Sequence, residues 1–359
     1  MKKVVLFISA ALAAFVMASC SQEDAIETEV SKNKVISFSA YINRQSRASD
    51  ATATTLQSAN LKVIAYETDA TPWASYNVTD AQQTLFMGSI DASKVISTMN
   101  VSYSGGWTYS PLKFWPGNDG KVSFFSYNGT GLVTKMGANA GAGAAPNIRV
   151  LVPDAVADQK DLVAATLIDQ SESTNGGQVN FTYKHILSKI GFKAKTSSDV
   201  SSSGITSVVV KSLKIKYKAS TLAAVGYYTF PSANGDDGSW YVATGTYHTT
   251  AGETLNTSNV SLALDGTTLT QLNDDDKFLM LVPQNVVKGD LLMDITYTIA
   301  FGADTHDISL TGVELEAIAS PMLQNTQYMY NLIISANAVA FGTMSVSAWQ
   351  DGSGIDQGV

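Results

Sequence analysis

The stretch Val35-Ile36-Ser37-Phe38-Ser39-Ala40-Tyr41-Ile42 indicates the fold class of this chain. Its apolar residues Ile36, Phe38, Ala40 and Ile42 alternate with Ser37, Ser39 and Tyr41. Because successive side chains of a strand point to opposite faces, this period of two predicts a β-strand with one buried face.

The same pattern extends through the rest of the chain. Leu213, Ile215 and Tyr217 alternate with lysines, and a longer alternating run covers 291–299. The unbroken apolar run 278–282 predicts a central strand covered on both faces. Only Asp91 to Thr98 is expected to form a short helix. The sequence therefore predicts an all-β protein.

Length and turn residues predict two domains. A chain of 359 residues exceeds what one hydrophobic core comfortably organises. The Gly-, Ser- and Asn-rich stretch Ser171 to Gln178 is the candidate boundary. We expect an N-terminal β-sandwich over 35–172 and a C-terminal β-sandwich over 177–359, with connections of Greek-key length.

The N-terminus has the order of a secretory signal. Lys2 and Lys3 precede an apolar run over 4–17, and small residues then lead to Cys20, the only cysteine. This arrangement resembles a bacterial lipobox, which implies a signal peptide over 1–19 and a lipid on Cys20. Residues 20–34 form an acidic tether that resembles a surface-export signal. The run over 4–17 is too short for a membrane anchor, since 14 residues at about 1.5 Å each do not cross ~30 Å.

Composition and motifs give no support for catalysis. The net charge of −8 disfavours nucleic-acid binding. His185, His248 and His306 lack the neighbouring His or Cys of a zinc site, so no metal and no cofactor is expected. The acidic run at 274–276 is interpreted as a solvated turn. Signature motifs of hydrolases and nucleotide-binding proteins are absent, and the chain is not expected to be an enzyme.

Two arginines follow the first strand directly. Arg44 and Arg47 precede a segment of mostly Ala, Thr and Ser that extends to Asn60. We expect that segment to be exposed and extended, the kind of site that proteases cut. An ordinary solvated loop is the alternative interpretation. The aromatic residues clustered over 107–127 are interpreted as core rather than as a carbohydrate-binding platform.

The order of these motifs resembles the fimbrillin family, the subunits of type V pili of Bacteroidales. The resemblance covers nearly the whole chain after the signal. It is carried by Cys20, the strand at 35–42, Lys113-Phe114-Trp115-Pro116, Lys121 to Tyr127, Phe181 to Ile190, Leu281-Val282-Pro283-Gln284, Asn325 to Leu332 and Ser347-Ala348-Trp349.

The resemblance implies two tandem transthyretin-like β-sandwich domains in a lipoprotein exported to the outer membrane and the cell surface. It also implies a pilin assembled with other pilin subunits. A protease cuts at Arg47, or at Arg44, and removes the strand that carries Ile36, Phe38, Ala40 and Ile42. A strand of a neighbouring subunit then fills the groove. The candidate donor strand runs from Val339 to Trp349, with Val339, Phe341 and Trp349 on one face and Met344 and Val346 on the other.

The resemblance leaves the place of the subunit open. The tail after Trp349 has only Ile355 and Val359 as clearly apolar residues, and the strand over 339–349 also suits the end of the second sandwich. Stalk, tip and anchor roles therefore stay open. A monomeric surface lipoprotein that binds glycan or a host protein receptor through loops such as 137–146 is the main alternative. An enzyme acting on surface polysaccharide is the third.

Overall fold

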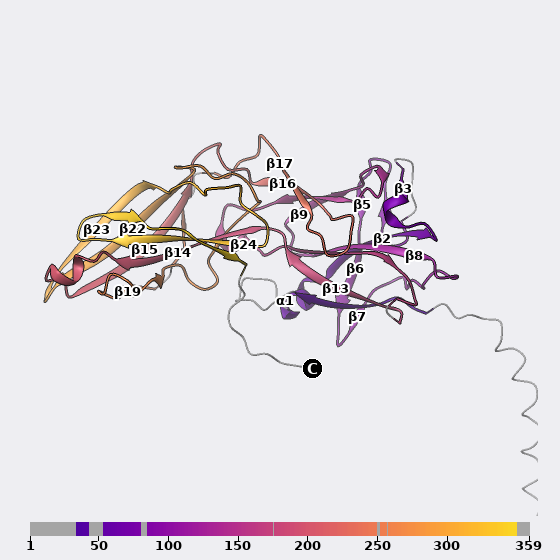
Figure 1. Ribbon diagram of the computed structural model, residues 1–359, viewed down its shortest axis with the longest axis horizontal. Helices are drawn as coiled ribbons and strands as arrows, with labels where there is room; N and C mark the ends of the chain where they lie inside the picture. The colour runs from indigo at the N-terminus through magenta and orange to yellow at the C-terminus, as the bar shows by residue number, and fades with distance from the viewer. Residues whose placement is uncertain are drawn as a thin grey trace, which may run out of the picture.

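The computed structural model describes residues 34–42, 53–79, 85–174, 176–249, 252–256 and 258–349. Nearly all regular structure in these ranges is β-strand, as predicted. The molecule is elongated, with one group of sheets toward each end (Figure 1). No helix within the described ranges has the length and apolar character needed to span a bilayer.

A seven-stranded sheet dominates the N-terminal half. Its strands, in spatial order, are β1 (Ser37–Ile42), β13 (Gln178–His185), β12 (Val163–Gln170), β8 (Lys121–Asn128), β2 (Leu61–Asp69), β6 (Met99–Tyr103) and β7 (Trp107–Thr108).

Both faces are buried in the central strands of this sheet, β2 and β8. On β2, Val63 and Ala65 point into one apolar cluster, whereas Ile64 and Tyr66 point into another. The second cluster is shared with a four-stranded sheet that completes a sandwich. That sheet consists of β17 (Ser239–Val242), β16 (Val225–Thr229), β11 (Asn147–Leu151) and β9 (Val133–Gly137).

The C-terminal half is a second sandwich. One sheet contains β20 (Thr270–Gln271), β14 (Ser188–Thr196), β24 (Thr326–Ile334) and β25 (Val339–Phe341), with β21 (Leu279–Leu281) on β14 and β26 (Ser345–Ala348) on β24. The other contains β18 (Gly252–Thr254), β15 (Ser207–Tyr217), β22 (Leu291–Phe301) and β23 (Asp304–Glu314), with β19 (Val260–Leu262) on β15. The predicted inward residues Leu213, Ile215 and Tyr217 lie in the core between them.

Short elements complete the described chain. Two ribbons pair β3 (Asn77–Val78) with β10 (Gly141–Ala142) and β4 (Ser89–Ile90) with β5 (Ile96–Ser97). The helical elements are α1 (Ala53–Ala59), η1 (Trp73–Ser75), η2 (Val156–Asp158) and η3 (Val200–Ser202).

The sequence interpretation of two segments was wrong. The helix expected over 91–98 is the turn and second strand of the β4–β5 hairpin, because the Asp91 carboxylate accepts hydrogen bonds from the amides of Ser93 and Val95. The segment up to Asn60, expected to be extended, contains α1. Its Leu56 is fully buried against the core beside β1, which supplies the tertiary contact that a short helix needs.

The chain passes from the first sandwich to the second after His185, not between 172 and 177 as predicted. β13 follows the predicted boundary, yet it pairs with β12 and β1. The stretch before β13 is the turn of the β12–β13 hairpin, where the Gly177 amide donates to the Glu172 carbonyl (3.1 Å). Turns and linkers share the same Gly-, Ser- and Asn-rich composition, so local sequence did not distinguish them.

The first sandwich also contains two strands from the C-terminal half of the chain. β16 and β17 lie between β15 and β18 in the sequence, but β16 pairs with β11 of the first sandwich and β17 pairs with β16. The two halves are thus joined by shared strands as well as by the direct connection from β13 to β14.

Candidate assembly site

β1 turns its predicted apolar face toward the core of the first sandwich. Ile36, just before β1, and Phe38 are 0% and 4% exposed, and Ala40 and Ile42 are partly buried against the same cluster. Tyr41, on the opposite face, is 61% exposed. The strand and its buried face are therefore as predicted, whereas its displacement stays a prediction.

Phe38 occupies an aromatic box. Its ring stacks on Phe181 with centroids 5.7 Å apart, and it meets Tyr109 at 5.3 Å and Phe124 at 6.2 Å edge to face. These geometries are the favourable ones for aromatic pairs. The box therefore favours a flat aromatic side chain at this position of whichever strand lies beside β13.

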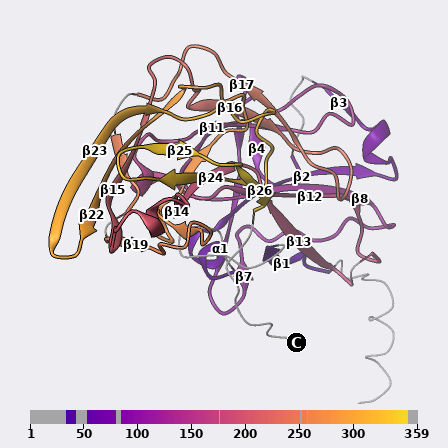
Figure 2. The ribbon, with the colours of Figure 1, turned by 60° about the vertical axis from the view of Figure 1, so that its left-hand side comes forward.

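The segment from Lys34 to Ile42 closes the seven-stranded sheet on itself. On one side β1 runs parallel to β13, with Phe38 opposite Val179. On the other side β1 lies against β7. Just before β1, the chain pairs with the segment that follows β7: the Ile36 amide donates to the Lys113 carbonyl (2.9 Å), and the Trp115 amide donates to the Lys34 carbonyl (2.9 Å). Figure 2 shows the two ends of this sheet, β1 and β13 at one and β7 at the other, close together in the lower part of the molecule.

Side chains reinforce this closure. The Tyr109 hydroxyl donates to the Ile36 carbonyl (2.8 Å), and the Trp115 indole Nε1 donates to the Gly177 carbonyl (2.9 Å). Trp115 is 1% exposed, so this hydrogen bond is made in a dry environment. The sequence indicated Trp115 as core, but nothing local revealed that it bridges to the β12–β13 turn.

The predicted processing and anchoring residues cannot be placed. Cys20, Arg44 and Arg47 lie outside the described residues. β1 ends at Ile42 and α1 begins at Ala53, so the candidate cleavage sites fall between these two elements in the sequence.

The candidate donor segment forms two short strands instead of one. β25 and β26 both pair antiparallel with β24, along the same side. Between them the Gly342 backbone amide donates to the Asn331 backbone carbonyl (2.7 Å). The side-chain Nδ2 of Asn331 donates to the Thr343 backbone carbonyl (2.6 Å). This interruption shifts the side-chain alternation.

The faces of the segment therefore differ from the prediction. Val339, Phe341 and Met344 all pack partly buried on the core of the second sandwich, although Met344 was expected on the other face. Val346 is 58% exposed. Trp349 leaves this surface altogether and joins the core of the first sandwich, where it is 4% exposed.

Trp349 covers a group of buried ionisable side chains. Its ring stacks on His185 with centroids 4.7 Å apart and planes within 3°, and Lys189 Nζ lies 5.0 Å from its centroid. His185 Nδ1 lies 2.6 Å from Asp161 Oδ2. His185 and Lys189 belong to the sequence motif 181–190, but their convergence under Trp349 is a tertiary contact that no local pattern could reveal.

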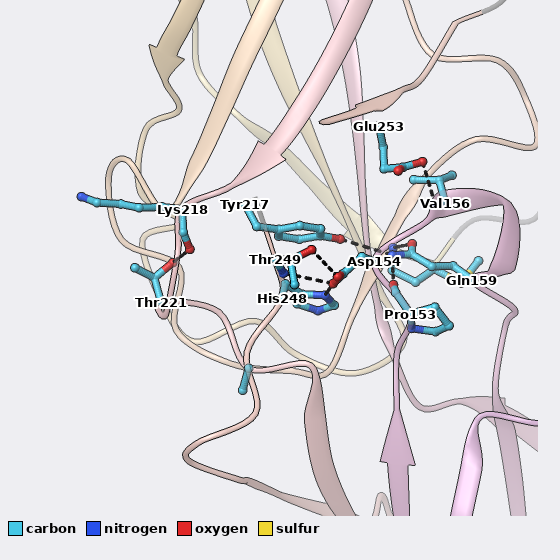
Figure 3. A network of polar contacts seen from close by, with 12 residues as sticks. Pro153, Asp154, Val156, Gln159, Tyr217, Lys218, Thr221, His248, Thr249 and Glu253 are labelled. Carbon is cyan, nitrogen blue, oxygen red and sulfur yellow. Dashed lines mark hydrogen bonds and ion pairs between the residues drawn. The ribbon is translucent and has the colours of Figure 1, made fainter. Parts of the chain in front are cut away.

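A second polar network joins the two sandwiches (Figure 3). His248 stacks on Tyr217 at 4.2 Å, and its Nδ1 donates to Asp154 Oδ1 (2.8 Å), while Thr249 Oγ1 donates to Asp154 Oδ2 (2.5 Å). Burial lowers the pKa of His248, and the contact with Asp154 offsets part of that effect. Burial by itself raises the pKa of Asp154, but hydrogen bonds from Thr249 and His248 hold it below its ordinary value. Asp154 also keeps Nδ1 as the protonated nitrogen, because a carboxylate only accepts.

The histidine environments give no basis for a metal site. Within the described ranges, no group of three or more His, Cys, Asp or Glu side chains is arranged to hold a metal ion. The Nδ1 atoms of His185 and His248 lie instead within hydrogen-bond distance of a carboxylate oxygen of Asp161 and Asp154 respectively.

Comparisons with known proteins agree with this architecture. A family model described as fimbrillin-like matches residues 46–349. The chain is 26% identical to Fimbrium subunit Fim1C of Phocaeicola vulgatus over 96% of both chains. A crystal structure of a fimbrial protein from Bacteroides vulgatus shares the fold, with a TM-score of 0.65 at 23% identity, over 89% of this chain and 100% of that one. Since the family model spans most of the residues, including both sandwiches, the chain belongs to the fimbrillin-like family.

Proposed function

We propose that this chain is a structural pilin of a cell-surface fimbria that supports adhesion and biofilm formation. Its precursor is a lipoprotein, cleaved before Cys20 and anchored in the outer membrane by the lipid on that residue. Cleavage after Arg47, or after Arg44, removes β1, and a strand of another pilin subunit takes its place. Membership of the fimbrillin-like family supports the fimbrial role.

The position of β1 carries the strand-exchange part of the proposal. The segment 34–42 joins the two ends of the curled sheet, so its removal takes β1 away from the edge of β13 and the Ile36 amide away from the Lys113 carbonyl. It also uncovers the rings of Phe124 and Phe181. Burying a large apolar side chain contributes roughly 1.5–3 kcal/mol, so losing Ile36 and Phe38 strongly favours refilling the groove by another strand.

The C-terminal segment offers a matching occupant. Val339-Ala340-Phe341 repeats the order of Ile36-Ser37-Phe38, a branched aliphatic residue followed two positions later by phenylalanine. The same alignment places Thr343 and Ser345 where β1 has Ala40 and Ile42, so the match ends after Phe341. In this register, Phe341 of a second copy occupies the aromatic box of Phe38. Other pilins with the same pair of residues fit equally well.

Two forms of the chain test strand exchange. One begins at Gln22, which removes the lipid site and keeps β1, and the other begins at Ala48. We expect the first to stay monomeric and the second to form ladders in SDS gels run without heating. A further version of the second form, ending at Ser335, lacks the donor and is expected to form no ladder. A folded Ala48 form that remains monomeric at high concentration would contradict the proposal.

The N-terminal mass of the protein recovered from the cell surface tests processing. A species that begins at Ala48 without lipid supports cleavage after Arg47, and Arg47→Ala is expected to abolish it while Arg44→Ala does not. A species that begins at an acylated Cys20 and retains β1 overturns cleavage and favours an anchor subunit or a monomeric surface lipoprotein.

A further inference from the structure

Trp349 occupies an unusual place for a residue that directly follows an edge strand, β26. β25 and β26 belong to the second sandwich, but the indole of Trp349 packs with Ile186, Leu187 and Met280 in the core cluster of the first. His185 beneath it ends β13, and Lys189 lies in β14. The side chain therefore lies across the point where the chain crosses from one sandwich to the other.

Few directional bonds hold this end of the chain. The Trp349 amide donates to the Asn325 carbonyl (2.8 Å), and the Asn325 amide donates to the Leu187 carbonyl (3.0 Å). The indole Nε1 finds no hydrogen-bond acceptor within the described part of the chain. Stacking and burial of the ring are thus the main attractions, and Nε1 gains a water partner when the ring leaves.

The surface beneath Trp349 differs in kind from the groove beneath β1. The groove of β1 is lined by apolar and aromatic side chains, so an empty groove is unfavourable in water. Beside the apolar side chains of its cluster, the surface beneath Trp349 contains Asp161, His185 and Lys189, each at most 2% exposed. Water solvates ionisable groups well, so exposing this surface costs less than exposing an apolar one.

The pairing of the segment with β24 is also modest. β26 carries the exposed Val346, and β25 is only three residues long. The interruption at 342–344 separates the two strands and depends on Asn331. The segment from Val339 to Ala348 is therefore an edge held on β24 by two short strands and three partly buried side chains, and its far end is fixed by one large buried side chain.

We propose that Trp349 is a reversible latch that holds the segment Val339–Ala348 on the chain's own β24. When the ring withdraws, the segment loses its far attachment and the polar surface of Asp161, His185 and Lys189 becomes hydrated. The latch is a property of the single chain. We expect the latch to keep this segment from entering the groove of a second copy too early, and this role rests on the proposed function.

Hydrogen exchange on the uncut, lipid-free monomer tests the latch. We expect Trp349→Ala to accelerate exchange of the amides of 339–348 at least tenfold, while amides of β22 in the same sandwich keep their wild-type rates. Trp349→Phe keeps a ring over His185, so the exchange rate of its 339–348 amides is expected to lie between those of the wild type and Trp349→Ala. The matched control Val346→Ala changes an exposed side chain of the same segment and is expected to leave exchange unchanged.

Two outcomes overturn the latch. Equal protection of 339–348 in the wild type and in Trp349→Ala shows that the ring does not hold the segment. Equal acceleration in the segment and in β22 shows that Trp349 contributes only to global stability. If Trp349→Ala does not fold, the same exchange rates are compared between Trp349→Phe and Val346→Ala. Faster exchange of 339–348 in Trp349→Phe alone, with β22 unchanged, supports the latch, and equal exchange in both variants overturns it.

A separate assay tests the use of the latch. In the form beginning at Ala48, Trp349→Phe is expected to form ladders faster than the unaltered form. An unchanged rate overturns the role in assembly even if the exchange result holds. Absence of ladders from the unaltered form contradicts the proposed function and leaves the exchange result standing.

Discussion

The rings of Phe38 and Phe181 stack with their planes within 6° and their centroids 5.7 Å apart. One belongs to the first strand of the described chain and the other to β13, which is also its backbone neighbour. Side-chain and main-chain contacts thus bind the same two strands. β1 is consequently an integral part of the first sandwich and not a loosely added edge.

Replacing Phe38 by alanine should destabilise the uncut chain strongly. The change removes a buried ring and leaves a cavity between Phe124 and Phe181, which typically costs about 3–5 kcal/mol. Urea unfolding followed by circular dichroism measures the loss. Tyr41→Ala, on the exposed face of the same strand, should change stability by less than about 0.5 kcal/mol. Similar effects of the two changes would argue against a core role for β1.

Trp115→Phe should loosen the closure of the curled sheet. The variant keeps an aromatic ring but removes the indole donor to the Gly177 carbonyl, which retains the Ser37 amide (3.3 Å), so the loss is that of one hydrogen bond, about 0.5–1.5 kcal/mol. Thermal unfolding measures this effect. The neighbouring Phe114 is 49% exposed, so Phe114→Leu serves as the control and should leave the midpoint nearly unchanged.

A cysteine pair tests the proposed register between two copies. With Phe341 in place of Phe38, Gly342 replaces Ser39, which lies opposite Asn180. A Cβ at Gly342 meets its nearest neighbour at 3.5 Å, so Gly342→Cys is tolerated. Polymers of the Ala48 form carrying Gly342→Cys and Asn180→Cys should form intermolecular disulfides on oxidation.

The control pair for this register is Ala340→Cys with Asn180→Cys. Two residues along a strand add about 7 Å, beyond what a disulfide spans. Equal cross-linking of both pairs would show that the donor has no fixed register.

Acidification should weaken the joint between the sandwiches through His248. Its pKa is lowered in the folded state, so below its ordinary value of 6.5 the unfolded chain binds a proton that the folded chain does not. The free energy of unfolding therefore falls as pH drops below that value. The pKa of Asp154 is also lowered in the folded state, so the free energy of unfolding falls further as pH drops below 3.8, the ordinary pKa of an aspartate.

His248→Gln should reduce this pH dependence. The slope between pH 6.5 and 5 should become shallower by up to about 1.4 kcal/mol per pH unit. Urea unfolding of the wild type and of His248→Gln at several pH values measures this slope. A steeper slope in His248→Gln would mean that the folded state binds the proton more tightly than the unfolded chain, the reverse of the expectation.

Strand alternation was sufficient to predict the fold class, and the order of the motifs was sufficient to predict the family. Ile36 and Phe38, or Leu213 and Ile215, alternate in a way that only a half-buried strand explains, and their burial confirms it. The family match confirms the resemblance, and with it the prediction of a structural subunit instead of an enzyme. Cys20, Arg44 and Arg47 stay predictions, since they lie outside the described residues.

Local sequence failed where contacts between distant segments decide the structure. α1 mixes helix formers such as Ala53 and Leu56 with two β-branched threonines and is only 7 residues long, so it depends on the burial of Leu56. The interruption between β25 and β26 depends on Asn331, and the surface under Trp349 gathers side chains from three separate segments. None of these contacts has a sequence period, so local patterns do not reveal them.

The parallel pairing of β1 with β13 also constrains the order of synthesis and export. Ser39 and Asn180, hydrogen-bonded partners in these strands, are 141 residues apart in the chain. At about 5–20 residues per second, a ribosome makes β13 on the order of ten seconds after β1. The strand that closes the first sandwich is therefore synthesised first and can be seated only after the rest of its sheet exists. A chain that emerges N-terminus first presents its closing strand unpaired to any factor that binds extended apolar segments, long before the groove that receives it has formed.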